Sequence, residues 1–217
     1  DTLTTSGYPR FVKYWKRATP IRSATAVLES KKTDARAWAT TIFTPAGNKA
    51  LVIRSPSFYE DEVYEFTSDL KLRKIEKPLD AQYMGWLSGN DILLLRSDWN
   101  VRGEIFKAGS LIAIQPIVGA QPKTIFQPGP RQSIDNVEQT KDALIVSYLD
   151  TVQGKIGRAF LRDGVWVMET LPFPEHGTLG ISSVDPYGEL VLTNFENFLS
   201  PSSVLMALIG LSTLKLR

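Results

Sequence analysis

The sequence contains no cysteine and only one histidine among its 217 residues. The absence of cysteine excludes a disulfide framework and a thiolate metal site, and a single histidine leaves little from which to build a zinc site. The sequence also lacks a Gly-x-Ser-x-Gly nucleophile elbow and a phosphate-binding glycine loop. The chain therefore carries none of the motifs by which serine hydrolases or nucleotide-binding enzymes are recognised.

Long apolar runs and an excess of one charge sign are also missing. The longest apolar run, residues 204–211, is far shorter than the roughly 20 residues of a membrane helix, so it predicts a buried strand. The first ten residues have no apolar signal core. The 25 basic and 23 acidic residues give a net charge of +2, which supplies no reason to expect nucleic acid or a membrane as partner. The compartment, cytoplasmic or periplasmic, is left open.

Short runs of β-forming residues recur throughout the chain. Residues 132–171 contain four such runs, separated by turn signals that include an Asp163-Gly164 hairpin, and four antiparallel strands in about 40 residues make one propeller blade. Similar groups occupy residues 35–78, 81–128 and 178–217, and in the group 81–128 a longer loop, residues 99–109, is predicted between the second and third strands. The groups begin near residues 35, 81, 132 and 178, so successive starts lie 46, 51 and 46 residues apart, close to the period of roughly 40–50 residues of a blade. No sustained helical period occurs. The pattern predicts an all-β fold, a β-propeller of four-stranded antiparallel blades, over a sandwich or closed barrel.

Two further strands, at 11–16 and 25–29, precede the first group, and residues 1–30 are predicted to be the outer half of another blade. The chain as a whole, 1–217, is then one partial propeller. Its strand at 11–16 would present an unpaired edge, and its last group an apolar face. We therefore expect the isolated chain to self-associate, most simply as a dimer that covers the exposed blades, or else to aggregate. The alternative is a monomer whose end blades close a smaller ring. The apolar residues expected to be exposed are Val204, Leu205, Met206, Leu208, Ile209 and Leu211.

Few residues are candidates for chemistry. His176 lies in the loop between the third and fourth groups and is predicted to be a surface histidine rather than a catalytic one. The nearest approach to a nucleophile elbow, around Ser182, has Val184 where the second glycine should be, and it falls within a predicted strand. The acidic group of Glu60, Asp61, Glu62 and Glu65 straddles a hairpin, which favours a solvated turn over a metal site. No catalytic, cofactor-binding or metal-ligating residue is predicted, and no cofactor.

Several short stretches stand out when they are taken together in their order and spacing. They are residues 5–10 (TSGYPR) with Lys13, 15–17 (WKR), Thr19-Pro20, 95–99 (LRSDW), 108–114 (AGSLIAI), 140–142 (TKD), 149–152 (LDTV) and 198–203 (FLSPSS). This set resembles the N-terminal β-propeller of bacterial members of the prolyl oligopeptidase family (S9) of serine peptidases. The resemblance spans nearly the whole chain, although Ala18 stands where the family pattern has glycine.

The resemblance implies a parent protein with a seven-bladed propeller followed by an α/β-hydrolase domain that carries the catalytic Ser, Asp and His. Such a peptidase cleaves short peptides after proline, and its propeller covers the active site and limits substrate size. This chain would supply about four and a half blades. None of the family's catalytic residues has a counterpart here, so the chain alone is expected to be inactive, with the hydrolase domain and the parent's peptide substrates as partners. The alternative is a stand-alone propeller that binds a protein or peptide.

Overall fold

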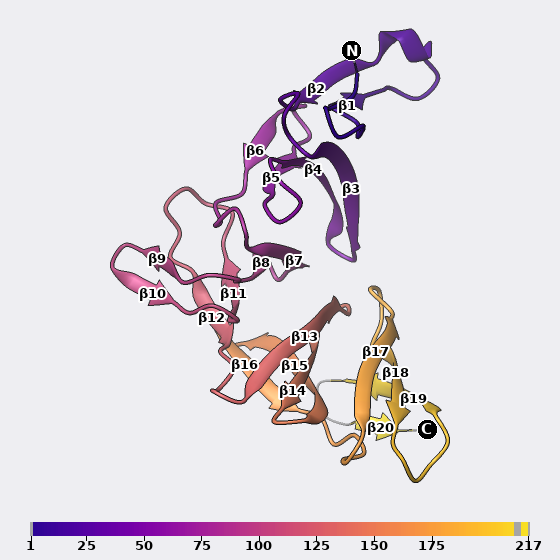
Figure 1. Ribbon diagram of the computed structural model, residues 1–217. Helices are drawn as coiled ribbons and strands as arrows, with labels where there is room; N and C mark the ends of the chain where they lie inside the picture. Colours follow the sequence, from indigo (N-terminus) through magenta and orange to yellow (C-terminus); the bar gives the residue numbers. More distant parts are fainter. Residues whose placement is uncertain (1, 211–213, 217) are drawn as a thin grey trace. The chain divides into compact units, whose positions relative to one another are not determined.

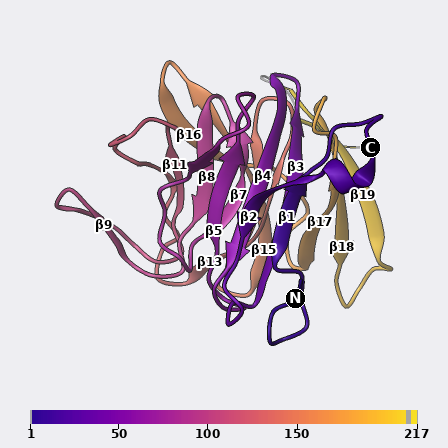
Figure 2. The same cartoon turned by 90° about the horizontal axis from the view of Figure 1, so that it is seen from above.

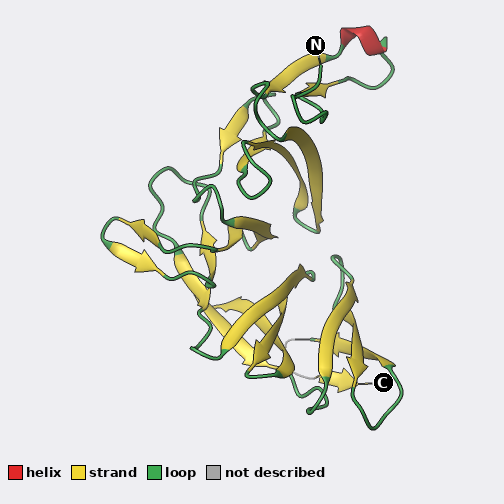
Figure 3. Cartoon of the chain, viewed as in Figure 1, coloured by secondary structure: helices red, strands yellow, loops and turns green. Residues whose placement is uncertain are grey.

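The computed structural model describes residues 2–210 and 214–216, and almost all of its regular structure is β-strand. Within these residues the one helical segment is a single 3-10 turn, η1 (Ile21–Ser23), as Figure 3 shows. The prediction that the chain contains almost no helix is confirmed. No helix in the described part of the chain is long and apolar enough to cross a membrane. The chain divides into two compact units, Asp1–Gln82 and Tyr83–Arg217, each of which has its own sheets.

The first unit holds a two-stranded and a four-stranded antiparallel sheet (Figure 1). In the smaller sheet β1 (Phe11–Tyr14) pairs only with β2 (Thr25–Glu29) among the described strands. The predicted first strand ran to residue 16. It ends at Tyr14 because Trp15 and Thr19 close a turn, in which Trp15 Nε1 donates to the Thr19 carbonyl (3.0 Å). The larger sheet contains β3 (Arg36–Thr44), β4 (Gly47–Ser55), β5 (Glu62–Phe66) and β6 (Leu72–Lys74), in that order. We call it the first sheet, because the four-stranded sheets are numbered here in chain order.

The second unit contains three four-stranded antiparallel sheets. The second sheet of the chain has β7 (Gln82–Leu87), β8 (Asn90–Leu94), β11 (Leu111–Ile114) and β12 (Lys123–Phe126). The third sheet has β13 (Gln132–Gln139), β14 (Leu144–Asp150), β15 (Gln153–Arg162) and β16 (Val165–Thr170). The fourth sheet has β17 (Thr178–Val184), β18 (Leu190–Glu196), β19 (Ser203–Ile209) and β20 (Leu214–Leu216). In all three the spatial order follows the chain, as expected for propeller blades.

Two apolar cores hold these three sheets together. The first lies between the second and third sheets and is built around Ile92, Leu111, Leu144 and Val146, which are completely buried. The second lies between the third and fourth sheets and includes Ile145, Ile156 and Val191. Because successive strand residues point to opposite faces, β14 contributes Leu144 and Val146 to one core and Ile145 to the other. A strand buried on both faces reads as the continuous apolar run seen in the sequence.

The segment 99–109, predicted to be a loop, contains a hairpin formed by β9 (Trp99–Val101) and β10 (Glu104–Phe106). Arg102 and Gly103 both have positive φ (52° and 86°), the backbone of the tight turns that suit two-residue hairpins. Asn100 Oδ1 accepts from the Gly103 N–H (3.1 Å) and fastens the turn. In Figures 1 and 2 this hairpin projects away from the second sheet, so the loop prediction was wrong here.

The apolar run of the fourth group is only partly exposed. Val204 and Leu208 are exposed, whereas Leu205 packs against the second core and Ile209 is buried in it. The alternation of strand side chains explains the difference. The last predicted strand, residues 211–217, overlaps β20, but 211–213 and 217, including the predicted apolar Leu211, lie outside the described residues.

Candidate functional site

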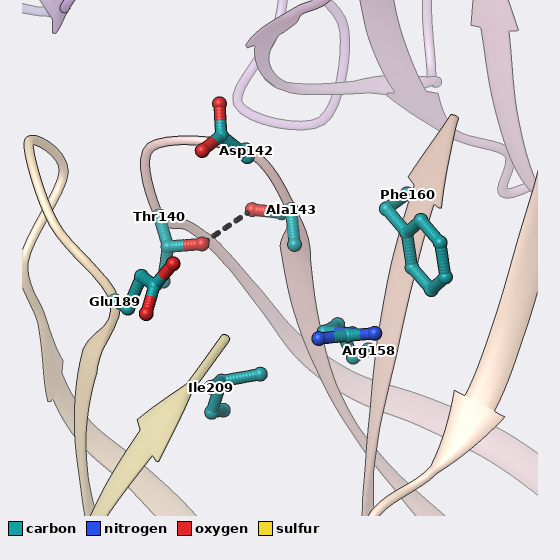
Figure 4. A pocket seen from close by; sticks show the side chains of 7 residues that line it. All are labelled: Thr140, Asp142, Ala143, Arg158, Phe160, Glu189 and Ile209. Carbon is teal, nitrogen blue, oxygen red and sulfur yellow. Dashed lines mark hydrogen bonds between the residues drawn. The ribbon is translucent and has the colours of Figure 1, made fainter. Parts of the chain in front are cut away.

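The third and fourth sheets enclose two small clefts at opposite ends of the interface between them. Residues in and beside the turns β13–β14 and β17–β18 line the first cleft. Residues beside the turn β14–β15 and in the connection between β16 and β17 line the second. These turns lie at opposite ends because neighbouring strands are antiparallel. The first cleft is lined by Thr140, Asp142, Ala143, Arg158, Phe160, Glu189 and Ile209 (Figure 4).

Arg158 is the central side chain of the first cleft. It extends from β15 toward the fourth sheet, where its Nη1 donates to the Gly210 carbonyl, and its Nη2 donates to Glu169 Oε2 on β16 (3.1 Å). Its guanidinium carbon lies 4.4 Å from the centre of the Phe160 ring. The Arg158 side chain is 6% exposed, and its Nε has no hydrogen-bond partner among the described residues. Arg158 therefore joins the two sheets through a nearly dry contact.

The remaining space in this cleft is small. Asp142 and Glu189 flank its mouth in Figure 4, and Thr140 Oγ1 donates to the Ala143 carbonyl at its edge (3.1 Å). The free volume is about 10 Å³, which is close to the room needed by one water molecule. The first cleft is therefore a structural junction between two sheets rather than a binding site for a peptide.

Replacing Arg158 with alanine should lower the free energy of unfolding by about 2 kcal/mol, because the inter-sheet hydrogen bond and the stacking on Phe160 are both lost. Arg162→Ala is the matched control. Arg162 contacts the same Glu169 (3.4 Å) and the same Phe160 ring (4.9 Å), but it is 55% exposed. Its loss should cost less than about 1 kcal/mol. Urea unfolding followed by circular dichroism measures both, and equal effects would contradict the role given to Arg158.

The second cleft is larger and opens at the other end of the interface, with a free volume of about 140 Å³. Leu171, Pro172, Phe173 and Pro174 of the connection 171–177 form one wall, held by the Leu171 N–H donating to the Ile156 carbonyl (2.8 Å). Gln153, Gly154, Lys155 and Ile156 of β15 form the other wall, and Thr170, Glu175 and Leu179 complete it. The lining places backbone, amide and charged groups beside two prolines, and the residues that form it include no paired nucleophile and base.

The residues considered as candidates for chemistry, His176 and Ser182, are not joined by a described hydrogen bond. His176 is exposed in the connection 171–177, and its Nδ1 accepts from Gln153 Nε2 (3.2 Å). Ser182 is exposed on β17 at a β-bulge between Ile181 and Ser183, where the register with β18 shifts. It is in a strand, as predicted, rather than in a strained strand-to-helix turn. The histidine's described hydrogen bond thus goes to an amide and not to a serine or a carboxylate.

The acidic group around residue 60 is not the solvated turn that was predicted. Glu62 and Glu65 lie on β5 and are ion-paired, Glu65 with Arg73 on the neighbouring strand. Asp61 accepts from Ser55 Oγ, and Glu60 accepts from Ser57 Oγ (3.1 Å). Among the described residues no group of three His, Asp or Glu side chains is placed to hold a metal ion.

Glu62 belongs to a charged cluster that sequence reasoning missed. Arg54 on β4 donates from Nε and Nη2 to the two oxygens of Asp34 (2.7 and 3.0 Å) and from Nη1 to Glu62 Oε2 (2.8 Å). Lys74 on β6 donates to Glu62 Oε1 (2.6 Å), and the Tyr64 hydroxyl donates to Glu62 Oε2 (3.1 Å). The cluster ties the segment before β3 to three strands of the first sheet.

These contacts shift the pKa values of both carboxyl groups downward. Burial disfavours the ionised form of Glu62, but hydrogen bonds from Lys74, Arg54 and Tyr64 outweigh it and lower the pKa of Glu62 to about 2. The hydrogen bond from Arg54 lowers the pKa of Asp34, with burial opposing it. Both groups are therefore ionised at neutral pH.

The stability of the first unit should accordingly fall in acid. A carboxyl whose pKa is lower in the folded state than in the unfolded chain contributes stability above the unfolded value, about 4.3 for Glu, and loses it as pH falls toward the folded value. Between pH 5 and pH 2 the contribution of Glu62 should decline by on the order of 2 kcal/mol. Glu62→Gln should be less stable at pH 7 and show a flatter pH dependence over this window, measured by urea unfolding at each pH. A variant with the wild-type slope would contradict this.

The chain is similar to bacterial peptidases, although no family model matches it. It is 26% identical over 217 residues to an uncharacterized peptidase of Sinorhizobium fredii and 28% identical over 219 residues to an uncharacterized peptidase of Rickettsia prowazekii. In both cases 94% of this chain is covered, and the chain spans 30% of the length of the relative. Most of each relative thus lies outside the matched region.

Solved structures show the same similarity. A post-proline cleaving enzyme from Rickettsia typhi matches all of this chain with a TM-score of 0.86 at 25% identity, over 33% of its own length. Oligopeptidase B from Leishmania major matches 97% of the chain with a TM-score of 0.70. Because the two sequences are only 10% identical, this match supports the fold and nothing more. The predicted resemblance to the propeller of prolyl oligopeptidase-type peptidases is confirmed, and so is the predicted all-β propeller fold.

Proposed function

We propose that this chain is the propeller portion of a prolyl-oligopeptidase-like serine peptidase and that, in the parent protein, it covers the active site and restricts access to short, proline-containing peptides. The observation that carries the proposal is the match of the whole chain to one third of a post-proline cleaving enzyme. The described residues bring together no nucleophile, base and acid, which agrees with a catalytic centre located elsewhere in the parent. Its partners would be an α/β-hydrolase domain of the same polypeptide and the peptide substrates.

The parent open reading frame gives the first test. A hydrolase domain with a nucleophile elbow in that reading frame supports the proposal, and its absence favours a stand-alone propeller that binds a protein or peptide. The expressed parent should release chromophore from a Gly-Pro-linked substrate and label with a fluorophosphonate probe. The isolated chain of residues 1–217 should do neither, and labelling of any of its serines would contradict the assignment.

Restriction of access can be tested separately in the parent. The first strand of a blade lines the central channel of a propeller, and Ser182 is exposed on β17, the first strand of the fourth sheet. Ser182→Trp should lower kcat/KM severalfold for peptides of 10 or so residues and leave a short chromogenic substrate almost unaffected. Val165→Trp, on the outer strand β16 where Val165 is also exposed, is the control. Equal effects of Ser182→Trp on short and long substrates would refute channel gating.

The isolated chain is expected to self-associate. Val204 and Leu208 on β19 are exposed, and β1 pairs with a strand on one side only within the described residues. Exposed apolar side chains and open strand edges favour contact with a second chain. Light scattering at micromolar concentration should report a mass above that of a monomer, and Val204→Ser/Leu208→Ser should reduce it. A monomer mass that persists on concentration would exclude self-association.

A further inference from the structure

The net charge of +2 conceals an uneven distribution of charge along the chain. From residue 2 to residue 28 the sequence has five basic residues and no acidic one. Four of the five lie at the end of β1 or in the segment that joins β1 to β2, namely Lys13, Lys16, Arg17 and Arg22. We call residues 13–24 the basic loop, and Figure 3 shows its 3-10 turn η1 in red. We propose that the basic loop is a docking surface for a membrane of anionic phospholipids.

The positive charge of the basic loop is not neutralised within the described part of the chain. All four basic side chains are exposed, and no ion pair joins any of them to another described residue. The fifth basic residue, Arg10, is ion-paired with Glu29 at the other end of the β1–β2 pair. An anionic surface would supply the counter-charge that the basic loop lacks.

Exposed apolar side chains lie among these cations. Ile21 is 73% exposed, Trp15 is 44% exposed and Tyr14 is 37% exposed. Trp and Tyr are enriched where a membrane meets water, because one part of the side chain is apolar and the other is polar. Lys and Arg beside them keep their charged ends at the lipid headgroups while their stems lie along apolar surface. This combination of side chains is typical of segments that bind at a membrane surface.

The basic loop is held in place by contacts of its own. Trp15 Nε1 donates to the Thr19 carbonyl (3.0 Å), and Thr19 Oγ1 donates to the Lys16 carbonyl (2.6 Å). The Tyr14 ring lies 5.6 Å from the Phe66 ring of β5, between ring centres, which joins the loop to the first sheet. Because the indole N–H of Trp15 is already hydrogen-bonded, the ring can enter an apolar environment without leaving a donor unpaired. The loop is thus preorganised for docking.

The same four charges also suit a nucleic acid, and the apolar side chains decide between the two partners. Single-stranded nucleic acid is bound by cations together with aromatic rings on which bases stack. Ile21, the most exposed apolar side chain of the basic loop, has no ring to offer a base. An aliphatic side chain instead gains by entering the boundary between lipid headgroups and acyl chains. The observations therefore favour a lipid surface.

The binding should be strong only at an anionic surface and at low salt. Each Lys or Arg held near such a surface strengthens binding about fivefold, so four of them contribute on the order of several hundredfold. Salt screens these charges over about 8 Å at physiological ionic strength and over a shorter distance as salt rises.

Sedimentation with lipid vesicles tests the proposal on the chain of residues 1–217, with a run without vesicles as the blank for self-association. The chain should sediment with phosphatidylcholine vesicles that contain roughly one third phosphatidylserine, and it should stay in solution with phosphatidylcholine alone. Lys16→Glu/Arg17→Glu should weaken binding at least about thirtyfold. Arg131→Glu/Lys141→Glu is the matched control, because it changes the net charge equally at two exposed positions outside the basic loop, and it should bind like the wild type.

Tryptophan fluorescence tests whether the basic loop itself meets the lipid. Brominated phosphatidylcholine in the anionic vesicles should quench the wild-type emission, and Trp15→Phe should remove this quenching. Trp38→Phe is the control, because Trp38 on β3 is exposed to a similar extent, 38%, and should leave the quenching intact. Ile21→Ser should weaken binding severalfold without changing the melting temperature, since the side chain is exposed.

Three results would overturn the proposal. Equal binding to both kinds of vesicle would show that anionic lipid is not recognised. Wild-type binding by Lys16→Glu/Arg17→Glu would place the contact elsewhere on the chain. Tighter binding to a single-stranded oligonucleotide than to the anionic vesicles would identify a nucleic acid as the partner. None of these measurements uses peptidase activity, so their failure is distinguishable from a failure of the proposed function.

Discussion

Arg54→Ala is expected to destabilise the first unit by about 3–5 kcal/mol, the cost typical of removing one partner from a buried ion pair. The substitution would leave two carboxylates without their common partner. Asp34 is 5% exposed and Glu62 is 14% exposed, and Arg54 donates to both. Lys74 still pairs with Glu62, but Asp34 would keep only the backbone N–H of Lys31 as a described donor. The loss of stability therefore comes mainly from a buried charge at Asp34.

Arg73→Ala is the control for this prediction. Arg73 lies on β6 of the same sheet and pairs with Glu65, but the side chains are 33% and 27% exposed. Solvent screens such a pair, so its removal should cost under about 1 kcal/mol. Urea unfolding of the full chain at pH 7 compares the two variants. If Arg54→Ala proved no more harmful than Arg73→Ala, the cluster would not hold the segment before β3 to the sheet.

What the sequence could predict was local. Asp163-Gly164 was recognised as a hairpin, and its φ values of 51° and 77° are those that the dipeptide favours. The repeat of four-strand groups followed from the same alternation and turn signals. The hairpin at Arg102-Gly103 was missed, although its turn contains a glycine, because the strands on either side are only three residues long. Short strands leave little alternation to detect.

What the sequence could not predict was the choice of distant partners. Asp34 and Arg54 are 20 residues apart, and Arg158 reaches Gly210 across 52 residues. Charged residues are abundant in this chain, and nothing in the local pattern tells a buried pair from a solvated one. Glu62 was assigned to a solvated turn for this reason. The exposure of Phe198 and Leu199 could not be predicted either, since a Phe-Leu pair beside a strand suggests burial.

Gly154 on the third sheet lies against the backbone of Leu179 on the fourth sheet, and Gly154→Ala is the second change expected to have a large effect. A Cβ atom at this position would lie 2.6 Å from the backbone nitrogen of Leu179 and 3.2 Å from the Leu179 carbonyl oxygen. Backbone atoms cannot rotate away as a flexible side chain can. The two sheets would have to move apart, and Leu179 belongs to the core between them. Overpacking of this kind should lower the free energy of unfolding by about 3 kcal/mol.

Gly180→Ala provides a matched control on the strand that Gly154 meets. Gly180 follows Leu179 on β17, has no positive φ, and a Cβ there would meet no atom within 4 Å. Alanine also restricts the unfolded chain more than glycine does, so Gly180→Ala should be neutral or stabilising by up to about 1 kcal/mol. Urea unfolding of both variants decides the matter. Because Gly154 also lines the second cleft, amide hydrogen exchange at the turn 151–152 should become faster in Gly154→Ala alone. Similar stability of the two variants would mean that the sheets are not in close contact at this point.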